Sequence, residues 1–259
     1  MYRVDASRWR EEVLLAANAA RFAERRLGFV PDAQQADLLR RSPRRCLLNC
    51  TRQWGKSTVT AARAVHEAYY RPGSLTLVIS PSARQSGEFL GRVAEFMRAL
   101  GIRPRGDGRN EMSLQFPNGA RVVGLPGNEA TVRGFSKVSL LLVDEAAQVS
   151  DSLYRTVRPM LAVGGGALWL LSTPFGKRGF FYKEWVGEGN WDRVTVRATD
   201  CPRIPADFLE EERRALTPLW FRQEYLCEFM DTEDAAIRRD WIEAAVTDRV
   251  VPLQFGWVV

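Results

Sequence analysis

The chain has 259 residues, 46% of them hydrophobic, and carries a formal charge of +6 at pH 7. This length can bury a sizeable core, as one large or two small domains. No apolar run approaches the roughly 20 residues that span a bilayer, and the first residues lack the pattern of a secretory signal. We therefore expect a globular protein that acts inside a cell, with no membrane partner.

The residue counts also exclude some kinds of site. The four cysteines form no C-x-x-C pair and there is one histidine, so a common zinc site or a histidine-based triad would lack ligands. The positive charge favours a polyanion as partner, because cations along a groove release counterions from phosphates. The basic residues are dispersed, however, and each cluster on its own is also typical of a solvated face.

Two helices are predicted near the amino terminus. In residues 6–26, Trp9, Val13 and Leu14 recur at helical spacing, with Ser7 as a possible N-cap and Gly28 as the stop. The proline and aspartate at positions 31 and 32 favour the start of a second helix, which continues to residue 39.

The next segment has the order strand, loop, helix. Residues 46–48 are apolar and residues 61–68 have a helical pattern. The loop between them fits G-x-x-x-x-G-K-[ST] at every fixed position but the first, where Cys50 replaces glycine. The loop residues that could contact a nucleotide are Cys50, Thr51, Arg52, Gln53, Trp54, Gly55, Lys56 and Ser57.

This pattern predicts a phosphate-binding loop. Gly55 lets the backbone turn so that N–H groups point inward, and the following helix directs its positive end to the same place. Lys56 would reach the β- and γ-phosphates of ATP, and the Ser57 hydroxyl would bind the Mg2+ that bridges them. The alternative is a chance match, since Gly-Lys-Ser is a common tripeptide.

Strands and helices alternate downstream of the loop. A strand over 74–80 followed by a helix over 83–100 favours a parallel sheet with right-handed crossovers. Residues 111–116 and 120–125, joined by Pro117-Asn118-Gly119, are instead typical of a hairpin, which we place at an antiparallel edge.

A second apolar run, residues 138–143, is typical of a strand buried on both faces and ends in Asp144-Glu145. Ligands of open α/β sheets bind at the carboxyl ends of the strands. Asp144 could hold the metal through a water, and Glu145 could align and deprotonate the attacking water. Alone, the two acids could also be a solvated turn, but the phosphate loop upstream favours the catalytic interpretation.

The remaining elements return to the same edge. After a helix over 152–163, a strand over 167–171 delivers Ser172 and Thr173, whose hydroxyls could sense the γ-phosphate, although Ser172 could instead cap the next helix. From residue 176 the spacing of the aromatic residues indicates core packing rather than base stacking. A strand over 193–197 and helices over 205–215 and 218–228 predict a small lid on the nucleotide side.

These motifs, in this order, resemble those of the large terminase subunits of tailed bacteriophages, which pump DNA into procapsids. The resemblance covers about residues 29–259. It rests on Arg52-Gln53 before Gly55-Lys56-Ser57, on Asp144-Glu145-Ala146-Ala147, on the coupling-motif match Leu171-Ser172-Thr173-Pro174, and on the segment from Phe221 to Phe229.

The resemblance implies a fold and a division of the chain. The fold is α/β, a P-loop NTPase of the RecA/ASCE-like class. It is a three-layer sandwich with a mostly parallel central sheet, an antiparallel edge hairpin and a small C-terminal lid subdomain. Residues 1–175 would form the ATPase core and residues 176–250 the lid. Residues 251–259 would begin a nuclease domain that is otherwise missing, so we expect no nuclease activity.

The resemblance also implies roles for three further side chains. Gln35 would read the adenine edge, the alternative being an exposed helical glutamine. Arg133 would reach the ATP of a neighbouring subunit as an arginine finger, stabilising charge on the transferred phosphate. Arg52, read in the family as a sensor or finger within its own loop, is the rival, and an ordinary loop arginine is the alternative for either.

The implied function is Mg2+-dependent ATP hydrolysis that translocates double-stranded DNA into a procapsid in the host cytoplasm. The implied partners are further copies in a homo-oligomeric ring, a pentamer by the resemblance, the portal protein of the procapsid and the small terminase subunit. One alternative is a helicase-like nucleic-acid-dependent ATPase, for whose second motor domain the chain has no room. Another is a nucleotide-gated scaffold module that does not hydrolyse ATP, against which Glu145 argues.

Overall fold

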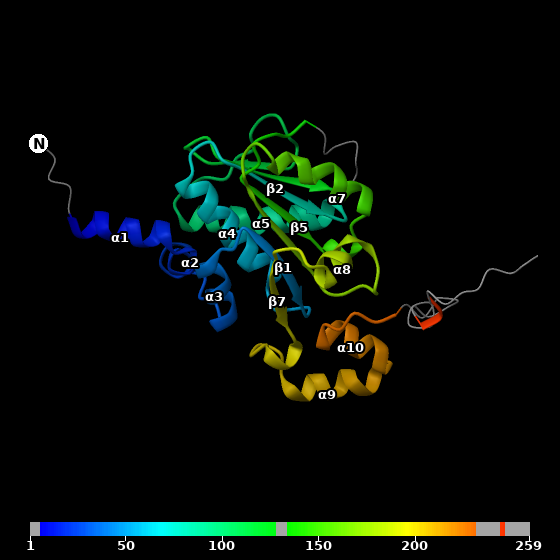
Figure 1. Ribbon diagram of the computed structural model, residues 1–259. Helices are drawn as coiled ribbons and strands as arrows, with labels where there is room; N and C mark the ends of the chain where they lie inside the picture. Colours follow the sequence, from blue (N-terminus) through cyan, green and yellow to red (C-terminus); the bar gives the residue numbers. More distant parts are fainter. Residues whose placement is uncertain (1–5, 128–133, 232–243, 247–259) are drawn as a thin grey trace, which may run out of the picture.

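The computed structural model describes residues 6–127, 134–231 and 244–246. One seven-stranded sheet with the order β3-β4-β2-β5-β6-β1-β7 forms its centre (Figure 1). Its neighbouring strands are parallel except β3 and β4 at one edge, which are antiparallel. The strands are β1 (Arg45–Cys50), β2 (Leu75–Ser80), β3 (Ser113–Gln115), β4 (Arg121–Pro126), β5 (Leu140–Asp144), β6 (Ala167–Ser172) and β7 (Asp192–Val196). The predicted mostly parallel sheet with an antiparallel edge hairpin is confirmed.

Helices cover both faces of this sheet. Successive side chains of a strand point to opposite faces, so Leu140 and Leu142 of β5 enter one core while Leu141 and Val143 enter another. The first core also contains α2 (Ala19–Leu27), α3 (Ala33–Arg41), α4 (Lys56–Tyr70) and α5 (Ala83–Ala99), and the second contains α7 (Asp151–Val157) and α8 (Gly179–Val186). The arrangement is the expected three-layer α/β sandwich, in which strands buried on both faces read as continuous apolar runs.

The predicted single helix over residues 6–26 is wrong. Two helices, α1 (Ala6–Ala17) and α2, meet at Asn18, whose extended backbone ends the first and whose side chain accepts a hydrogen bond from the Arg21 N–H. Ser7 lies inside α1 and is not its cap, whereas Gly28 ends α2 in the left-handed conformation, as predicted. Helix α1 extends away from the sheet (Figure 1) and leaves Trp9 64% exposed.

Two other helices end earlier than the sequence indicates. The predicted helix over 152–163 is α7 followed by a 3-10 turn, Arg158–Leu161, in which Pro159 lacks the N–H that an α-helical bond would need. Helix α10 (Pro218–Leu226) stops before residue 228 because Cys227 takes a left-handed conformation, with φ of 58°.

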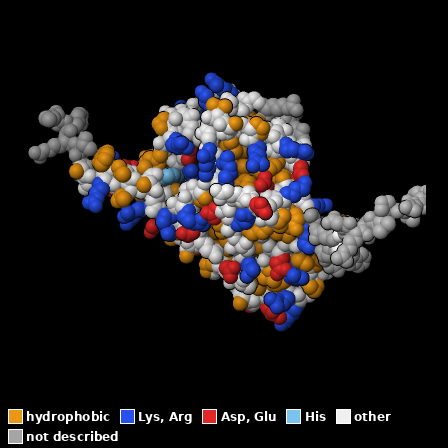
Figure 2. All heavy atoms as spheres, viewed as in Figure 1, with side chains coloured by type: hydrophobic (Ala, Val, Ile, Leu, Met, Phe, Trp, Pro, Cys, Tyr) orange, Lys and Arg blue, Asp and Glu red, His pale blue; other side chains and the backbone are white. Residues whose placement is uncertain are grey.

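Helix α9 (Ala206–Ala215) and α10 lie together beyond the ends of β1 and β7 (Figure 1). A 3-10 turn, Ala198–Asp200, connects β7 to this pair, and another, Ala146–Gln148, follows β5. Lys and Arg side chains are spread over the face shown in Figure 2 rather than gathered on one element. Among the described residues, no helix combines the length and the hydrophobicity needed to cross a membrane.

Candidate functional site

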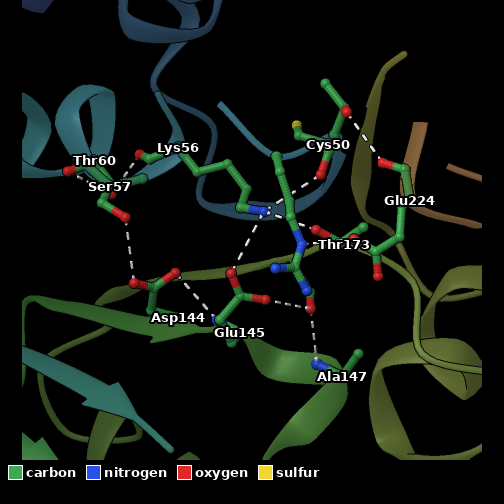
Figure 3. A network of polar contacts seen from close by, with 12 residues as sticks. Cys50, Lys56, Ser57, Thr60, Asp144, Glu145, Ala147, Thr173 and Glu224 are labelled. Atoms are coloured by element: carbon green, nitrogen blue, oxygen red, sulfur yellow. Dashed lines mark hydrogen bonds and ion pairs between the residues drawn. The ribbon is translucent and has the colours of Figure 1, made fainter. Parts of the chain in front are cut away.

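Three neighbouring parallel strands end side by side and bring the predicted site residues together. In the sheet register Asp144 of β5 lies beside Leu171 of β6, and Ser172 of β6 lies beside Asn49 of β1. The loop after β1 carries Lys56 and Ser57 to the same edge (Figure 3). Because the carboxyl ends of parallel strands share one edge, residues far apart in the sequence meet here.

The loop between β1 and α4 turns sharply at Gly55, which has a φ of 91° and precedes the first residue of α4. A Cβ at this position would lie 3.1 Å from the Gln35 amide nitrogen, so both conformation and space require glycine. The 15-residue helix α4 therefore directs its N-terminus, the positive end of its dipole, to the loop.

The missing glycine at Cys50 has a structural explanation. Cys50 is the last residue of β1, fully buried and paired with Val196 of β7, so its backbone is extended and needs no glycine. Burial raises the pKa of its thiol far above the usual range, which keeps the sulfur neutral. The Cys50 carbonyl takes part in the site by accepting a hydrogen bond from Lys56.

The Lys56 ammonium is the centre of the site. It lies 3.3 Å from the Cys50 carbonyl oxygen, 3.1 Å from Thr173 Oγ1 and 3.6 Å from Glu145 Oε1, and the residue is only 7% exposed. A buried cation needs such partners, because desolvation is costly without them. Its contacts come from the loop, from the end of β5 and from the segment after β6, so Lys56 joins all three motifs (Figure 3).

The two acids differ in their surroundings. Asp144 is 6% exposed, accepts hydrogen bonds from Ser57 Oγ at 3.4 Å and the Glu145 N–H at 3.1 Å, and has its pKa raised to about 6, first by burial and then by the neighbouring charge of Glu145. Glu145 has a φ of 49°, an uncommon left-handed conformation that turns its side chain back toward Lys56. Neither acid is the solvated turn considered as the alternative.

Ser172 fixes the position of Glu145. Its fully buried hydroxyl donates to Glu145 Oε2 at 3.3 Å and accepts from the Ala147 N–H at 3.3 Å. The alternative that Ser172 caps the following helix is wrong, because the residue before α8 is Arg178 and Ser172 bonds to the 3-10 turn after β5 instead.

Gln35 is held inside the protein by both ends of its amide. Its oxygen accepts from the Asp32 N–H at 3.1 Å in a capping box at the start of α3, and its nitrogen donates to the Trp54 carbonyl at 2.7 Å. The residue is 2% exposed, so the alternative of an exposed helical glutamine is wrong. Its contact with Trp54 places it against the loop, while its role toward adenine stays a prediction.

Arg52 and Thr51 turn toward α10. Arg52 Nε lies 2.6 Å from Glu224 Oε2, and Thr51 Oγ1 donates to the Glu224 carbonyl oxygen at 3.0 Å. Sequence reasoning singled out Glu224 only as part of the closing segment, because nothing local to it indicates a partner 172 residues earlier. The predicted finger Arg133 lies outside the described residues, so its position is not compared with that of Arg52.

Comparison with known proteins decides the family. Residues 47–244 match the family model described as terminase large subunit, T4likevirus-type, N-terminal. The chain belongs to this family. Terminase large subunits of Thermus phage G20c and Thermus virus P23-45 are each 28% identical to it over 240 residues, covering 79% of this chain and 50% of theirs. The chain therefore spans about half the length of these curated terminases.

Solved terminase structures share the fold. The ATPase domain of the Thermus phage P74-26 large terminase superposes with a TM-score of 0.70 at 24% identity, covering 81% of this chain and 98% of that one. The HK97 bacteriophage large terminase has a TM-score of 0.67 at 13% identity, covering 83% and 55%. A large terminase from a thermophilic bacteriophage, in complex with ATP-gamma-S, has a TM-score of 0.64 at 14% identity, covering 76% and 52%.

The oxygen ligands at this terminase's loop fit Mg2+. Ser57 Oγ and Asp144 Oδ2 lie 3.4 Å apart, a hydroxyl and a carboxylate of the kind that this hard cation prefers while keeping several waters. No group of three or more His, Cys, Asp or Glu side chains suited to a metal occurs among the described residues. A site with two protein ligands and a phosphate is the usual arrangement for Mg2+ at such loops.

Proposed function

We propose that this chain binds ATP with Mg2+ at the carboxyl edge of its sheet and hydrolyses it, as the ATPase motor part of a terminase large subunit. The observation that carries the proposal is the Lys56 ammonium, which lies 3.6 Å from Glu145 Oε1 and 3.1 Å from Thr173 Oγ1. The loop, the acidic pair and the coupling motif thus converge where a terminal phosphate would need all three.

Binding would use the loop and the start of α4. Backbone N–H groups around Gly55 and the positive end of α4 attract phosphate oxygens. Lys56 would exchange its contacts with Thr173 and Glu145 for the β- and γ-phosphates. Ser57 and Asp144 would hold Mg2+, which when bound neutralises charge on the two phosphates.

Glu145 would act as the base of hydrolysis. One of its carboxylate oxygens accepts from Ser172 and the other faces Lys56, so once Lys56 turns to phosphate this second oxygen can accept a proton from the attacking water. Because Ser172 and Thr173 follow the same strand, a change at Lys56 or Glu145 reaches the segment after β6 directly. This supports their role in coupling nucleotide state to movement.

We further propose the larger setting of this activity. The motor would translocate double-stranded DNA into a procapsid in the host cytoplasm, as a homo-oligomeric ring that works with the portal protein and the small terminase subunit. Family membership and the excess of basic residues support this setting. Residues 1–175 would be the ATPase core, 176–250 the lid and 251–259 the start of a nuclease domain. The finger in trans would be Arg133, with Arg52 as rival.

Replacement of Lys56 tests the activity. Lys56→Ala removes the cation that contacts phosphate, and we expect phosphate release from ATP to fall to background. Lys183→Ala is the matched control, because Lys183 is a lysine 71% exposed in its side chain that pairs with Asp151 on the surface. Undiminished ATP hydrolysis by Lys56→Ala would remove the assignment of the loop, and an equal loss in both variants would point to a general defect.

A further inference from the structure

The nucleotide loop is tied to the last turn of α10 by bonds that the proposed reaction does not use. Arg52 Nε pairs with Glu224 Oε2 at 2.6 Å, and Thr51 Oγ1 donates to the Glu224 carbonyl oxygen. Just before the loop, Asn49 Nδ2 donates to the Cys227 carbonyl oxygen at 2.8 Å in a buried position. The end of α10 and its cap therefore face three successive residues of the chain that leads into the loop.

The same turn of α10 also contacts the segment that follows Thr173. Gln223 Oε1 accepts from the Gly176 N–H at 3.2 Å in the interior, and beyond the helix the Met230 carbonyl oxygen accepts from the Lys177 N–H at 3.1 Å. Helix α10 thus touches both parts of the chain that would change when a terminal phosphate arrives or leaves, the loop and the segment after β6.

The exposure of the ion pair is strongly asymmetric. The Arg52 side chain is 68% exposed and the Glu224 side chain only 14%. Glu224 is held in place by its helix, while the guanidinium is a solvated group on the loop that would wrap the phosphates. Ion pairs with one exposed partner are weak, so an approaching dianionic phosphate can replace the carboxylate as the partner of this arginine.

We propose that Glu224 is a positioning residue that competes with the terminal phosphate of a nucleoside triphosphate for Arg52. With no terminal phosphate present, Glu224 holds Arg52 against α10. When a triphosphate binds, Arg52 turns to the phosphate and the link between the loop and α10 loses its charged contact. This inference rests on the proposed function, because it assumes that the loop binds ATP, and it gives α10 a way to respond to the nucleotide.

The test compares the affinities of the 259-residue chain for two nucleotides, measured by calorimetry with Mg2+ present. In Glu224→Gln the competing charge is gone, so we expect ATP-gamma-S to bind about two- to fivefold more tightly while the affinity for ADP stays the same. In an Arg52→Gln background the same replacement should change neither affinity. Glu224→Asp, which draws the carboxylate back by one methylene, should give a smaller change in the same direction and serves if Glu224→Gln does not fold.

Glu228→Gln is the matched control, because Glu228 pairs with Arg222 at 2.8 Å just beyond the same helix and has no contact with the loop among the described residues. It should leave both affinities unchanged. An equal effect of Glu224→Gln on both nucleotides would show a purely structural role and overturn the inference, as would an unchanged ratio of affinities. Absence of any nucleotide binding by the unmodified chain would instead contradict the proposed function itself.

Discussion

At the scale of single residues, the contacts of Glu145 separate nucleotide binding from the chemical step. The carboxylate faces Lys56 and Ser172, whereas the loop backbone, Lys56 and Ser57 suffice to hold the phosphates. Glu145→Gln keeps the size of the side chain and its bond from Ser172 but removes the proton acceptor. We expect ATP affinity to change less than about threefold and turnover to fall roughly 100-fold or more.

The measurement is phosphate release at saturating ATP together with a binding titration. Glu88→Gln is its control, since Glu88 is an exposed glutamate of α5 that pairs with Arg84 on the surface. Turnover at the normal rate in Glu145→Gln would show that another group activates the water.

The residue-level prediction from sequence worked where a motif fixes the residue locally. Lys56, Ser57 and Asp144 were placed correctly beside one another because a loop and a buried strand lead to the same edge. The burial of Gln35 and the pairing of Glu224 were not predicted. Both depend on partners distant in sequence, the Trp54 carbonyl and the Arg52 guanidinium, which only the packed fold brings near.

At the scale of elements, strands were easier to predict than helix ends. A strand buried on both faces leaves a run of apolar residues, and β1, β2, β5 and β6 all show it. The break at Asn18 was missed because apolar residues keep helical spacing on both sides of it, while a single N-cap ends the helix. Cys227 likewise ends α10 with a conformation that its residue type does not announce.

The packing of α1 and α2 on α4 makes folding sensitive to pH through His66. Its Nε2 lies 3.1 Å from the Leu15 carbonyl oxygen, and its ring packs edge-on against Phe22 with centroids 5.3 Å apart. Burial lowers the pKa of His66 to about 4, and the charge of Arg63 acts in the same direction. The carboxylate of Glu67, which pairs with Arg63, opposes this shift.

The sign of the effect follows from the two pKa values. The unfolded chain, with the ordinary histidine pKa near 6.5, binds a proton between about pH 6.5 and pH 4 that the folded chain does not bind. The free energy of unfolding should therefore fall as the pH is lowered through this range, by about 1–3 kcal/mol from His66. His66→Gln cannot titrate but keeps a donor for the Leu15 carbonyl.

Urea unfolding of both proteins from about pH 7 to about pH 4 measures this contribution. The stability of the unmodified protein relative to His66→Gln should decrease toward low pH, because all carboxylates are common to both. A difference that stays constant with pH would mean that the histidine is not kept neutral by the fold.

At the scale of the whole molecule, the arrangement predicts that one chain does not hold a complete catalytic site. Within the described residues, the terminal phosphate position is served by Lys56 and Glu145, while Arg52 is engaged by Glu224. A second guanidinium is worth a large factor in phosphoryl transfer, so its delivery by a neighbouring copy would make turnover depend on assembly. Arg133 is the residue that we expect to supply it.

Arg133→Ala should bind ATP with little change and lose the part of the rate that rises with protein concentration, by about a thousandfold where assembly is complete. Mixing gives the sharper measurement. Lys56→Ala subunits are inactive in their own sites but carry an intact Arg133, so adding them to Arg133→Ala subunits should restore ATP hydrolysis that neither protein has alone. Arg84→Ala, which removes an exposed arginine paired with Glu88, is the control and should retain full activity unmixed. Restoration requires that the arginine act between subunits; mixtures that stay inactive although they assemble would place the finger within one chain, where Arg52 becomes the candidate.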